Sequence, residues 1–341
     1  MREQLTAQLK RIIKATAITS PLEFSFAGQV TQVPAEGAPP SAFNTMPTIP
    51  LVQYLFQSFY QYCYVQPFKD DLPPLETGQL TLNEALVQQL SEANDTKDRW
   101  ETGWQIAEIL PTGQIRAEKH GRTRYMWAGE FLSNQGFGGQ PQPGMQINAF
   151  FPKESATIQP GFFFTFGQTF KDSWEESNAM RLYWHIDEVG APKLLHGISS
   201  RLNRFRIPYR FKVLNNSMPF NRSDSAVLFL NRRYYRIAIE LMAEVHKEVK
   251  GHLKPDTPLF TKHMGRGLGL AEDPNNGDSF GMSRCRMVAE GLWNAFSLGL
   301  TGDKERFEQV EQQFGKYGIS LDRPYLNGGA IDQYISPGFA K

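Results

Sequence analysis

Cysteine is scarce in this 341-residue chain, which carries only Cys63 and Cys285. The two lie in different halves of the sequence and outside any Cys-x-x-Cys pair, so neither a disulfide framework nor a thiolate zinc site is predicted. The six histidines also lack the His-x-x-x-His spacing of a helical metal site. We therefore expect a protein of the reducing cytoplasm that holds no metal ion.

Long apolar runs and an excess of either charge are absent as well. No stretch of about 18 apolar residues occurs, and the opening segment lacks the apolar core and cleavage site of a signal peptide. Lys and Arg number 36 against 35 Asp and Glu, which gives a net charge of +1. That balance argues against binding of the whole chain to nucleic acid or to a membrane surface.

Apolar and aromatic side chains are abundant, with 40% hydrophobic residues and 25 Phe, enough for a large core. Helical spacing of apolar residues covers 1–17 and 49–68, and short strands broken by Gly, Pro and Asn follow over 103–170. A further helix is predicted within residues 80–96, with Thr81 or Asn83 as its cap. We predict an α+β fold of mixed helices and a twisted, largely antiparallel sheet, with a helical and β-rich N-terminal half.

The pattern changes near residue 172, after which strands alternate with helices. We therefore divide the chain into an N-terminal region, 1–172, suited to binding a peptide or a partner, and an α+β domain, 173–341. The boundary is soft, because strands on either side of it could share one sheet.

Positive charge is concentrated in one segment. Residues 181–286 contain 18 Lys and Arg against 10 Asp and Glu, whereas the rest of the chain contains 18 against 25. This segment is the candidate for binding an anion.

Two predicted strands in that segment present polar side chains on one face. Alternation in MRLYWHID places Arg181, Tyr183 and His185 on the same face, and YRFKVLNN places Arg210 and Lys212 likewise. If the two strands pair, His185 and Lys212 project into one cleft. The simpler interpretation of a lone strand histidine is a packed, hydrogen-bonded side chain.

Three arginines add candidates for holding an anion. Arg222 lies just before an apolar strand, while Arg284 and Arg286 lie at the start of a predicted helix, where backbone N–H groups also attract anions. Each has a structural alternative: Arg222 could pair with Asp224, and the other two could flank a helix that carries Glu290.

The glycine-rich stretch over 265–274 does not have the spacing of a dinucleotide or phosphate loop. We expect a mobile loop there that closes over a site.

The second half of the chain resembles the HopA-class type III effector family, which also includes stand-alone lyases of class V lanthipeptide and thioamitide pathways. The resemblance covers residues 176–300 and rests on the motif order YWHID, PYRFKVLN, NRSDSAVLFL, PDTPLFTKHMGRGLGLAEDP and SFGMSRCRMVAEGL. It implies that 173–341 is a lyase-like catalytic domain. Its active-site logic is similar to that of the phosphothreonine lyases of pathogens.

In such lyases a strand lysine removes the α-proton of a phosphorylated residue, a histidine protonates the departing phosphate, and arginines hold it. By this resemblance Lys212 is the base and His185 the acid. Arg222 and Arg284 would hold the phosphate, with Arg286 as a further candidate. The chemistry needs no cofactor.

One position departs from the phosphothreonine lyases, which carry a second lysine two residues before the histidine. Here that residue is Tyr183, with Arg181 two residues further back. These two side chains are left to stabilise the enolate-like intermediate.

The resemblance implies a phosphoserine or phosphothreonine lyase that forms dehydroalanine or dehydrobutyrine in a precursor peptide during peptide natural-product maturation. A separate Ser/Thr kinase would phosphorylate that peptide first. The alternatives are a non-catalytic phosphopeptide-binding or partner-binding protein and a secreted effector. The last is disfavoured by an N-terminal segment that is predicted to be helical and lacks serine.

Overall fold

The computed structural model describes residues 2–35, 49–72, 81–133, 140–171, 177–216 and 220–339. Helices and three antiparallel sheets alternate through these residues, which confirms the α+β class. The helices are α1 (Arg2–Lys14), α2 (Pro50–Phe59), α3 (Glu84–Ala93), α4 (Ala191–Arg204), α5 (Tyr235–Val249), α6 (Phe280–Ser297) and α7 (Asp303–Lys316), with a π-helix, η1 (Tyr60–Tyr64), directly after α2.

The strands fall into three groups along the chain. The first sheet contains β1 (Thr16–Ser20), β2 (Glu23–Phe26) and β3 (Gln29–Gln32). The second contains β4 (Arg99–Ile109), β5 (Ile115–Lys119), β6 (Arg122–Met126), β7 (Phe131–Ser133) and β8 (Gln146–Phe151). The central sheet contains β9 (Glu154–Ser155), β10 (Phe162–Phe166), β11 (Ala179–Trp184), β12 (Tyr209–Leu214), β13 (Ala226–Asn231), β14 (Lys262–Gly265) and β15 (Leu268–Glu272).

The central sheet has the order β14-β15-β11-β13-β12-β10-β9. The strands that carry Tyr183 and Lys212 therefore do not pair with each other, because β13 lies between β11 and β12. The register still aligns the polar residues, since Tyr183 and Lys212 both pair with Val227 of β13. Paired residues of antiparallel strands project from the same face, so the predicted alternation holds across all three strands.

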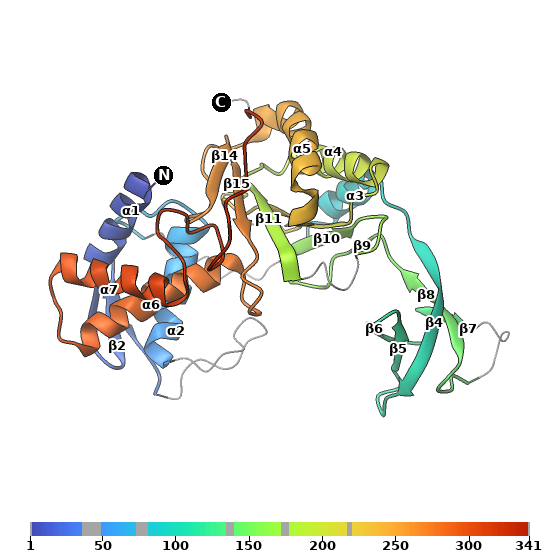
Figure 1. Cartoon of the computed structure of the whole chain (residues 1–341), viewed down its shortest axis with the longest axis horizontal. Coiled ribbons are helices and arrows are strands. Elements are labelled where there is room, and N and C mark those ends of the chain that lie inside the picture. Colours follow the sequence, from blue (N-terminus) through green and yellow to red (C-terminus); the bar gives the residue numbers. More distant parts are fainter. Residues whose placement is uncertain are drawn as a thin grey trace.

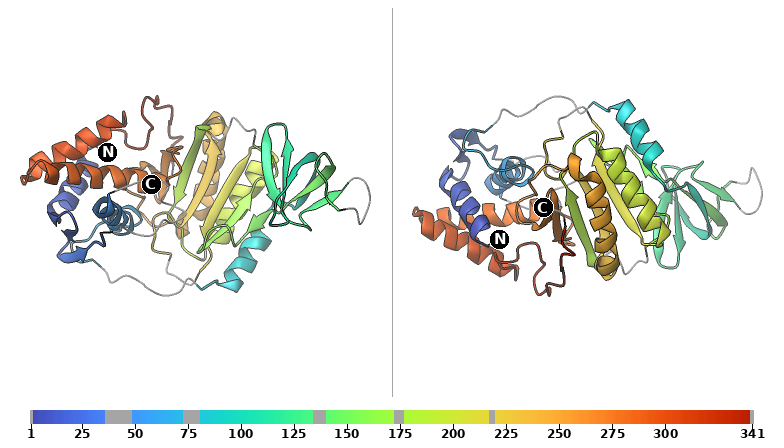
Figure 2. Two further views of the ribbon diagram at one scale, coloured as in Figure 1. Left: turned by 90° about the horizontal axis from the view of Figure 1, so that it is seen from below. Right: turned by 90° about the horizontal axis from the view of Figure 1, so that it is seen from above.

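Helices α4 and α5 cover one face of this sheet (Figures 1 and 2). That face carries Leu182 and Trp184 of β11 and Phe211 of β12, all fully buried. The opposite face carries the polar side chains predicted from sequence, which we call the polar face of the central sheet.

A helical lobe lies at the β14 end of the molecule and combines both ends of the chain (Figure 1). Helix α1 packs on α7, and α2 packs on α6. The predicted helices over 1–17 and 49–68 are confirmed, and Asn83 caps α3 by accepting a hydrogen bond from the Leu86 N–H at 3.1 Å. The small sheet β1–β3 was not predicted from sequence.

The expectation of a mobile loop at 265–274 is wrong. Strands β14 and β15 form a hairpin in the central sheet, and every residue of β15 is buried. Gly267 has a φ of +61°, and a Cβ there would lie 2.4 Å from the carbonyl oxygen of Lys254. Glycine is therefore required here by close backbone approach at a turn rather than by mobility.

The five-stranded sheet β4–β8 lies at the end of the molecule opposite the helical lobe (Figures 1 and 2). It has its own small core around Trp104, Ile106 and Ile147. Strands β9 and β10 follow it in the chain and join the central sheet, so that sheet continues across residue 172. No helix in the described ranges is both long and apolar enough to cross a membrane.

Candidate functional site

Cationic side chains gather on the polar face of the central sheet. Arg181 on β11 and Arg210 on β12 both pair with Phe229 of β13, and their guanidinium carbons lie 5.1 and 4.4 Å from its ring centroid. Lys212 follows two residues after Arg210 and so projects from the same face. This arrangement comes directly from strand alternation and register.

The amine of Lys212 is held in an unusual environment. Its Nζ lies 4.0 Å from the Phe162 ring centroid and donates a hydrogen bond to Gln159 Oε1 at 3.1 Å. Burial, reinforced by the positive charges of Arg181 and Arg222, lowers the pKa of Lys212 to about 7. The amine is therefore close to half neutral at physiological pH, which is the state a proton-abstracting base requires.

Arg222 and Asp224 form the ion pair that the sequence offered as the structural alternative. Arg222 Nε lies 2.9 Å from Asp224 Oδ1, and Nη2 lies 3.0 Å from Oδ2. Nη2 also donates to the Tyr60 hydroxyl at 3.3 Å. A guanidinium has five N–H donors, so these contacts leave the Nη1 hydrogens available for an anion. The Arg222 side chain is 29% exposed and can be reached from solvent.

Asp224 is buried, and its negative charge affects the pKa of Lys212. Burial raises the pKa of its carboxyl, but the attraction of Arg222 and the weaker one of Lys212 outweigh burial and lower the pKa overall. The carboxylate in turn raises the pKa of Lys212, against the effect of burial. Asp224 thus affects the protonation of Lys212 and leaves the Nη1 hydrogens of Arg222 uncontacted.

The π-helix η1 forms the opposite wall with two tyrosines that were not predicted as site residues. Tyr60 and Tyr64 stack with ring centroids 5.2 Å apart, and Tyr64 meets Tyr183 edge-on at 6.4 Å. Within the described residues, the buried hydroxyls of Tyr64 and Tyr183 make no well-formed hydrogen bond, although Tyr183 lies near enough to Tyr64 and Arg181 for both to act on its pKa. Buried unsatisfied polar groups are rare and mark places where a ligand or water is needed. From sequence, the aromatic run over 49–68 indicated only a buried helix.

His185 lies one residue beyond the end of β11 and is only 3% exposed. Its Nδ1 lies 3.2 Å from the carbonyl oxygen of Asp256, and because a carbonyl only accepts, Nδ1 carries the proton. Nε2 is buried and makes no well-formed hydrogen bond in the described part of the chain, although the backbone of Asn221 also acts to raise the pKa of the ring. Burial lowers the pKa of the ring, with the backbone of Asp256 opposing it, so the free imidazole is neutral near pH 7.

Arg284 is held by the protein itself. It is 1% exposed, and its Nε and Nη2 donate to the carbonyl oxygens of Pro324 and Leu326 at 2.8 and 2.9 Å. Its guanidinium lies 4.8 Å from the ring of Phe280, which packs against Tyr183. Arg284 therefore contacts the site through Phe280 and Tyr183. Its guanidinium would have to give up these two carbonyl oxygens to bind phosphate.

Arg286 lies elsewhere on α6. Its Nη2 pairs with Asp278 at 3.2 Å, and its guanidinium lies 4.5 Å from the ring of Phe56 in α2. The structure thus brings together Lys212, Arg222, Arg181 and Tyr183, with His185 at the end of the same strand as Tyr183. Arg284 contacts this group through Phe280, and Arg286 packs against α2.

Among the described residues, no group of three or more His, Cys, Asp or Glu side chains is arranged to hold a metal ion. Cys63 and Cys285 are both buried and reduced, and burial raises the pKa of each thiol.

Comparison with known families places this geometry in context. The model of the HopA1 effector protein family matches residues 153–326, half of the chain. The chain belongs to the HopA1 effector protein family. All seven site residues predicted from sequence lie inside the matched region, whereas η1 and its tyrosines lie outside it.

Two solved structures of effector proteins are similar to the chain. The effector protein from Pseudomonas syringae pv. tomato strain DC3000 is 14% identical, with 83% of this chain and 92% of that chain covered and a TM-score of 0.46. The effector protein from Pseudomonas syringae pv. syringae strain 61 is 15% identical, with 82% and 99% covered and a TM-score of 0.45. A search of curated protein sequences gave no match.

Gly281 in α6 is required by the way Tyr64 packs on that helix. A Cβ at this position would lie 2.3 Å from the Tyr64 ring. We expect Gly281→Ala to displace the ring and to lower the free energy of unfolding by about 1–3 kcal/mol, measured by urea denaturation. Gly315→Ala in α7 is the matched control, because nothing lies within 4 Å of its Cβ and alanine favours a helix. An equally stable Gly281→Ala variant would contradict this packing.

The lowered pKa of Lys212 can be measured without any assumption about function. Only a neutral amine reacts with acetic anhydride, so we expect the labelling rate of Lys212 to rise with pH and to reach half its maximum near pH 7. An ordinary lysine reaches that point near pH ~10.4. Mass spectrometry of proteolytic peptides gives the rates, with the 90% exposed Lys304 as the internal reference. A midpoint for Lys212 close to that of Lys304 would show that its environment is ordinary.

Proposed function

We propose that this protein is a cofactor-independent carbon–oxygen lyase that eliminates phosphate from phosphoserine or phosphothreonine in a peptide. The observation that carries the proposal is the amine of Lys212, which has a pKa lowered to about 7 and lies among arginines on one face of the central sheet. Strong pKa perturbation by burial and specific charges is typical of catalytic groups. Membership in the HopA1 effector protein family is consistent with it.

The elimination requires one base and one anion-binding group at the start. Neutral Lys212 Nζ takes the α-proton of the phosphorylated residue, and the electron pair of the broken C–H bond develops into the Cα=Cβ double bond. The Cβ–O bond then breaks, and its electron pair leaves with the phosphate. The Nη1 hydrogens of Arg222 would stabilise the phosphate as its negative charge grows, with a smaller contribution from Arg181, whose guanidinium is paired with Asp273 at 2.6 Å.

Tyr183 and His185 would supply the two remaining proton functions. The buried Tyr183 hydroxyl lies near Arg181 and Tyr64 but makes no well-formed hydrogen bond among the described residues, and it is suited to donate to the peptide carbonyl oxygen as the enolate-like charge appears. His185 must be protonated to act as the acid, although burial lowers its pKa. A bound phosphate dianion near Nε2 would raise that pKa again, because an opposite charge favours the imidazolium.

The substrate chemistry implies a partner reaction. The peptide must first be phosphorylated by a separate Ser/Thr kinase, and the product carries dehydroalanine or dehydrobutyrine, as in peptide natural-product maturation. We propose that both steps take place in the cytoplasm.

The direct test is to incubate the purified protein with kinase-phosphorylated peptides and to follow their masses. We expect the loss of one phosphoric acid per turnover, and thiol addition to the product should confirm the new double bond. A matched peptide that carries unphosphorylated serine is the control. Release of inorganic phosphate with serine regenerated would indicate hydrolysis and would refute the lyase.

A further inference from the structure

Three arginines gather with two phenylalanines where the five-stranded sheet meets the central sheet. The Arg99 guanidinium carbon lies 3.9 Å from the Phe170 ring centroid, and that of Arg122 lies 5.1 Å from the same ring. The guanidinium carbon of Arg124 lies 4.1 Å from the Phe151 ring centroid. We call Arg99, Arg122 and Arg124 the arginine cluster. It belongs to neither the predicted site nor the proposed reaction.

The cluster has more positive charge than its neighbours balance. Glu101 accepts contacts from both Lys119 and Arg122, at 2.7 and 2.6 Å. Nε and Nη1 of Arg99 are buried and form no hydrogen bond within the described ranges, and Arg124 forms no ion pair there. Burial, together with the charges of Arg122 and Arg124, lowers the pKa of Arg99. Buried guanidinium donors without partners are costly, and an added anion would satisfy them.

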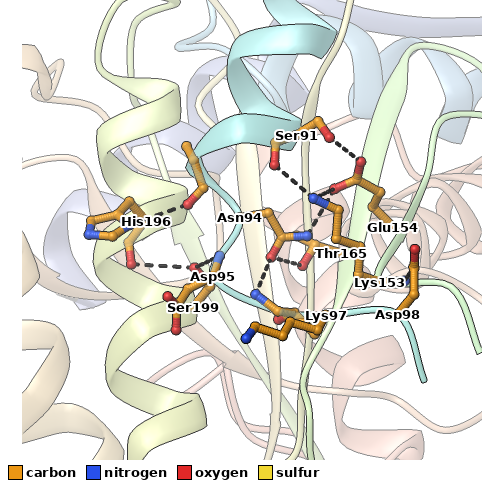
Figure 3. Close-up of polar contacts among 12 residues, drawn as sticks. Ser91, Asn94, Asp95, Lys97, Asp98, Lys153, Glu154, Thr165, His196 and Ser199 are labelled. Carbon is orange, nitrogen blue, oxygen red and sulfur yellow. Dashed lines mark hydrogen bonds and ion pairs between the residues drawn. The ribbon is translucent and has the colours of Figure 1, made fainter.

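The segment just before Arg99 is held by the polar network drawn in Figure 3. The Lys153 backbone N–H donates to Asp98 Oδ1 at 2.7 Å, and Asn94 Nδ2 donates to Glu154 Oε2 at 3.0 Å. The Asp95 backbone N–H donates to Ser199 Oγ of α4 at 3.0 Å. This network joins the segment before β4 to β9 and α4. The backbone that leads into Arg99 is therefore fixed by the protein's own contacts before any ligand arrives.

The charge around the cluster indicates the kind of anion. Residues 99–151 contain five Lys and Arg against four Asp and Glu, so no broad positive field surrounds the three arginines. A polyanion such as nucleic acid requires such a field. A few carboxylates require only planar donors in fixed positions, and guanidinium groups stacked on aromatic rings provide these.

We propose that the arginine cluster is a second anion site, which binds the carboxylates of an acidic segment in the peptide substrate. The ligand class rests on the proposed function, since it assumes a peptide. Phe162 beneath Lys212 and Phe170 beneath Arg99 are eight residues apart along the chain. Their Cα atoms are therefore separated by no more than about 29 Å, and roughly ten extended peptide residues can reach from one site to the other.

The test uses the full chain and two fluorescent synthetic peptides. Each carries one phosphoserine and, about ten residues away, a run of either glutamate or glutamine. We expect fluorescence anisotropy to show at least about tenfold tighter binding of the glutamate peptide, and Arg124→Gln should remove that preference. Arg116→Gln is the matched control, because Arg116 lies on the same sheet and pairs with Glu108 and Glu118. Thermal melts establish that each variant is folded, and Arg122→Gln replaces Arg124→Gln if the latter is not.

Two outcomes would overturn the proposal. One is equal binding of the glutamate and glutamine peptides, and the other is an equal loss of the glutamate preference in Arg116→Gln. The binding measurement needs no turnover. If the glutamate preference depends on Arg124 but no elimination occurs, the second site stands and the proposed reaction fails. If elimination occurs but the glutamate peptide is not preferred, the proposed reaction stands and the second site fails.

Discussion

Lys212→Ala lowers kcat for phosphate elimination by about 10²- to 10⁴-fold and leaves the phosphopeptide dissociation constant within a few-fold of that of the wild type. This is the expected result if Lys212 is the general base, since such groups contribute rate factors of this size. The arginines proposed to hold the phosphate remain in the variant. Quenched-flow or mass-spectrometric turnover assays, together with anisotropy binding curves, separate the two quantities.

Lys212→Arg sharpens this experiment. Arginine keeps the positive charge and much of the stacking on Phe162, but its pKa is too high for it to act as a base near neutral pH. We therefore expect it to be as inactive as Lys212→Ala while binding phosphopeptide at least as well. Lys304→Ala, at a 90% exposed position, serves as the control. Full turnover by Lys212→Arg would assign proton abstraction to another group, and binding without turnover by the wild type would favour the phosphopeptide-binding alternative.

The second large effect concerns stability. Asp224→Ala removes a buried carboxylate that accepts two hydrogen bonds from Arg222, so the guanidinium is left without its partner. Breaking such a pair typically costs 3–5 kcal/mol, and we expect about 3 kcal/mol because Arg222 is partly exposed. Asp70→Ala breaks the exposed pair with Arg11 and should change the unfolding free energy by less than about 0.5 kcal/mol.

Asp224→Ala should also change the pKa of Lys212. Because the negative charge of Asp224 raises the Lys212 pKa, its removal should move the acetylation midpoint below pH 7. The double variant Asp224→Ala, Arg222→Met should recover part of the lost stability, since no unpaired charge then remains. A single Asp224→Ala variant as stable as the wild type would mean that the pair contributes nothing to folding.

The sequence predicted which side chains share a face but not which strands are neighbours. Alternation of apolar and polar residues is local, so Arg181 and Tyr183 could be placed opposite Leu182 and Trp184. The insertion of β13 between β11 and β12 depends on the whole sheet. The hairpin of β14 and β15 was missed for a related reason, because glycines that permit close packing resemble glycines that permit motion.

The structural roles of Arg284 and Tyr60 could not be predicted for a different reason. The carbonyls that bind Arg284 come from 40 and 42 residues later in the chain, and Tyr60 meets Arg222 across 162 residues. Such contacts leave no periodic signal in the sequence. The arginine cluster was missed because alternate arginines on a strand resemble a solvated face, and Phe170 reaches them only through the folded backbone.

The position of η1 has a consequence for how the site forms during folding. Its tyrosines come from a segment near the N-terminus, yet the backbone N–H of Ser223 bonds to the carbonyl oxygen of Val65 and the Leu259 N–H bonds to that of Tyr64. Contacts between segments so distant in sequence form late, because a long loop must close first. A fragment limited to residues 153–326 would lack one wall of the site. In a chain still emerging from the ribosome, the site would therefore stay incomplete until α6 had docked onto α2 and η1.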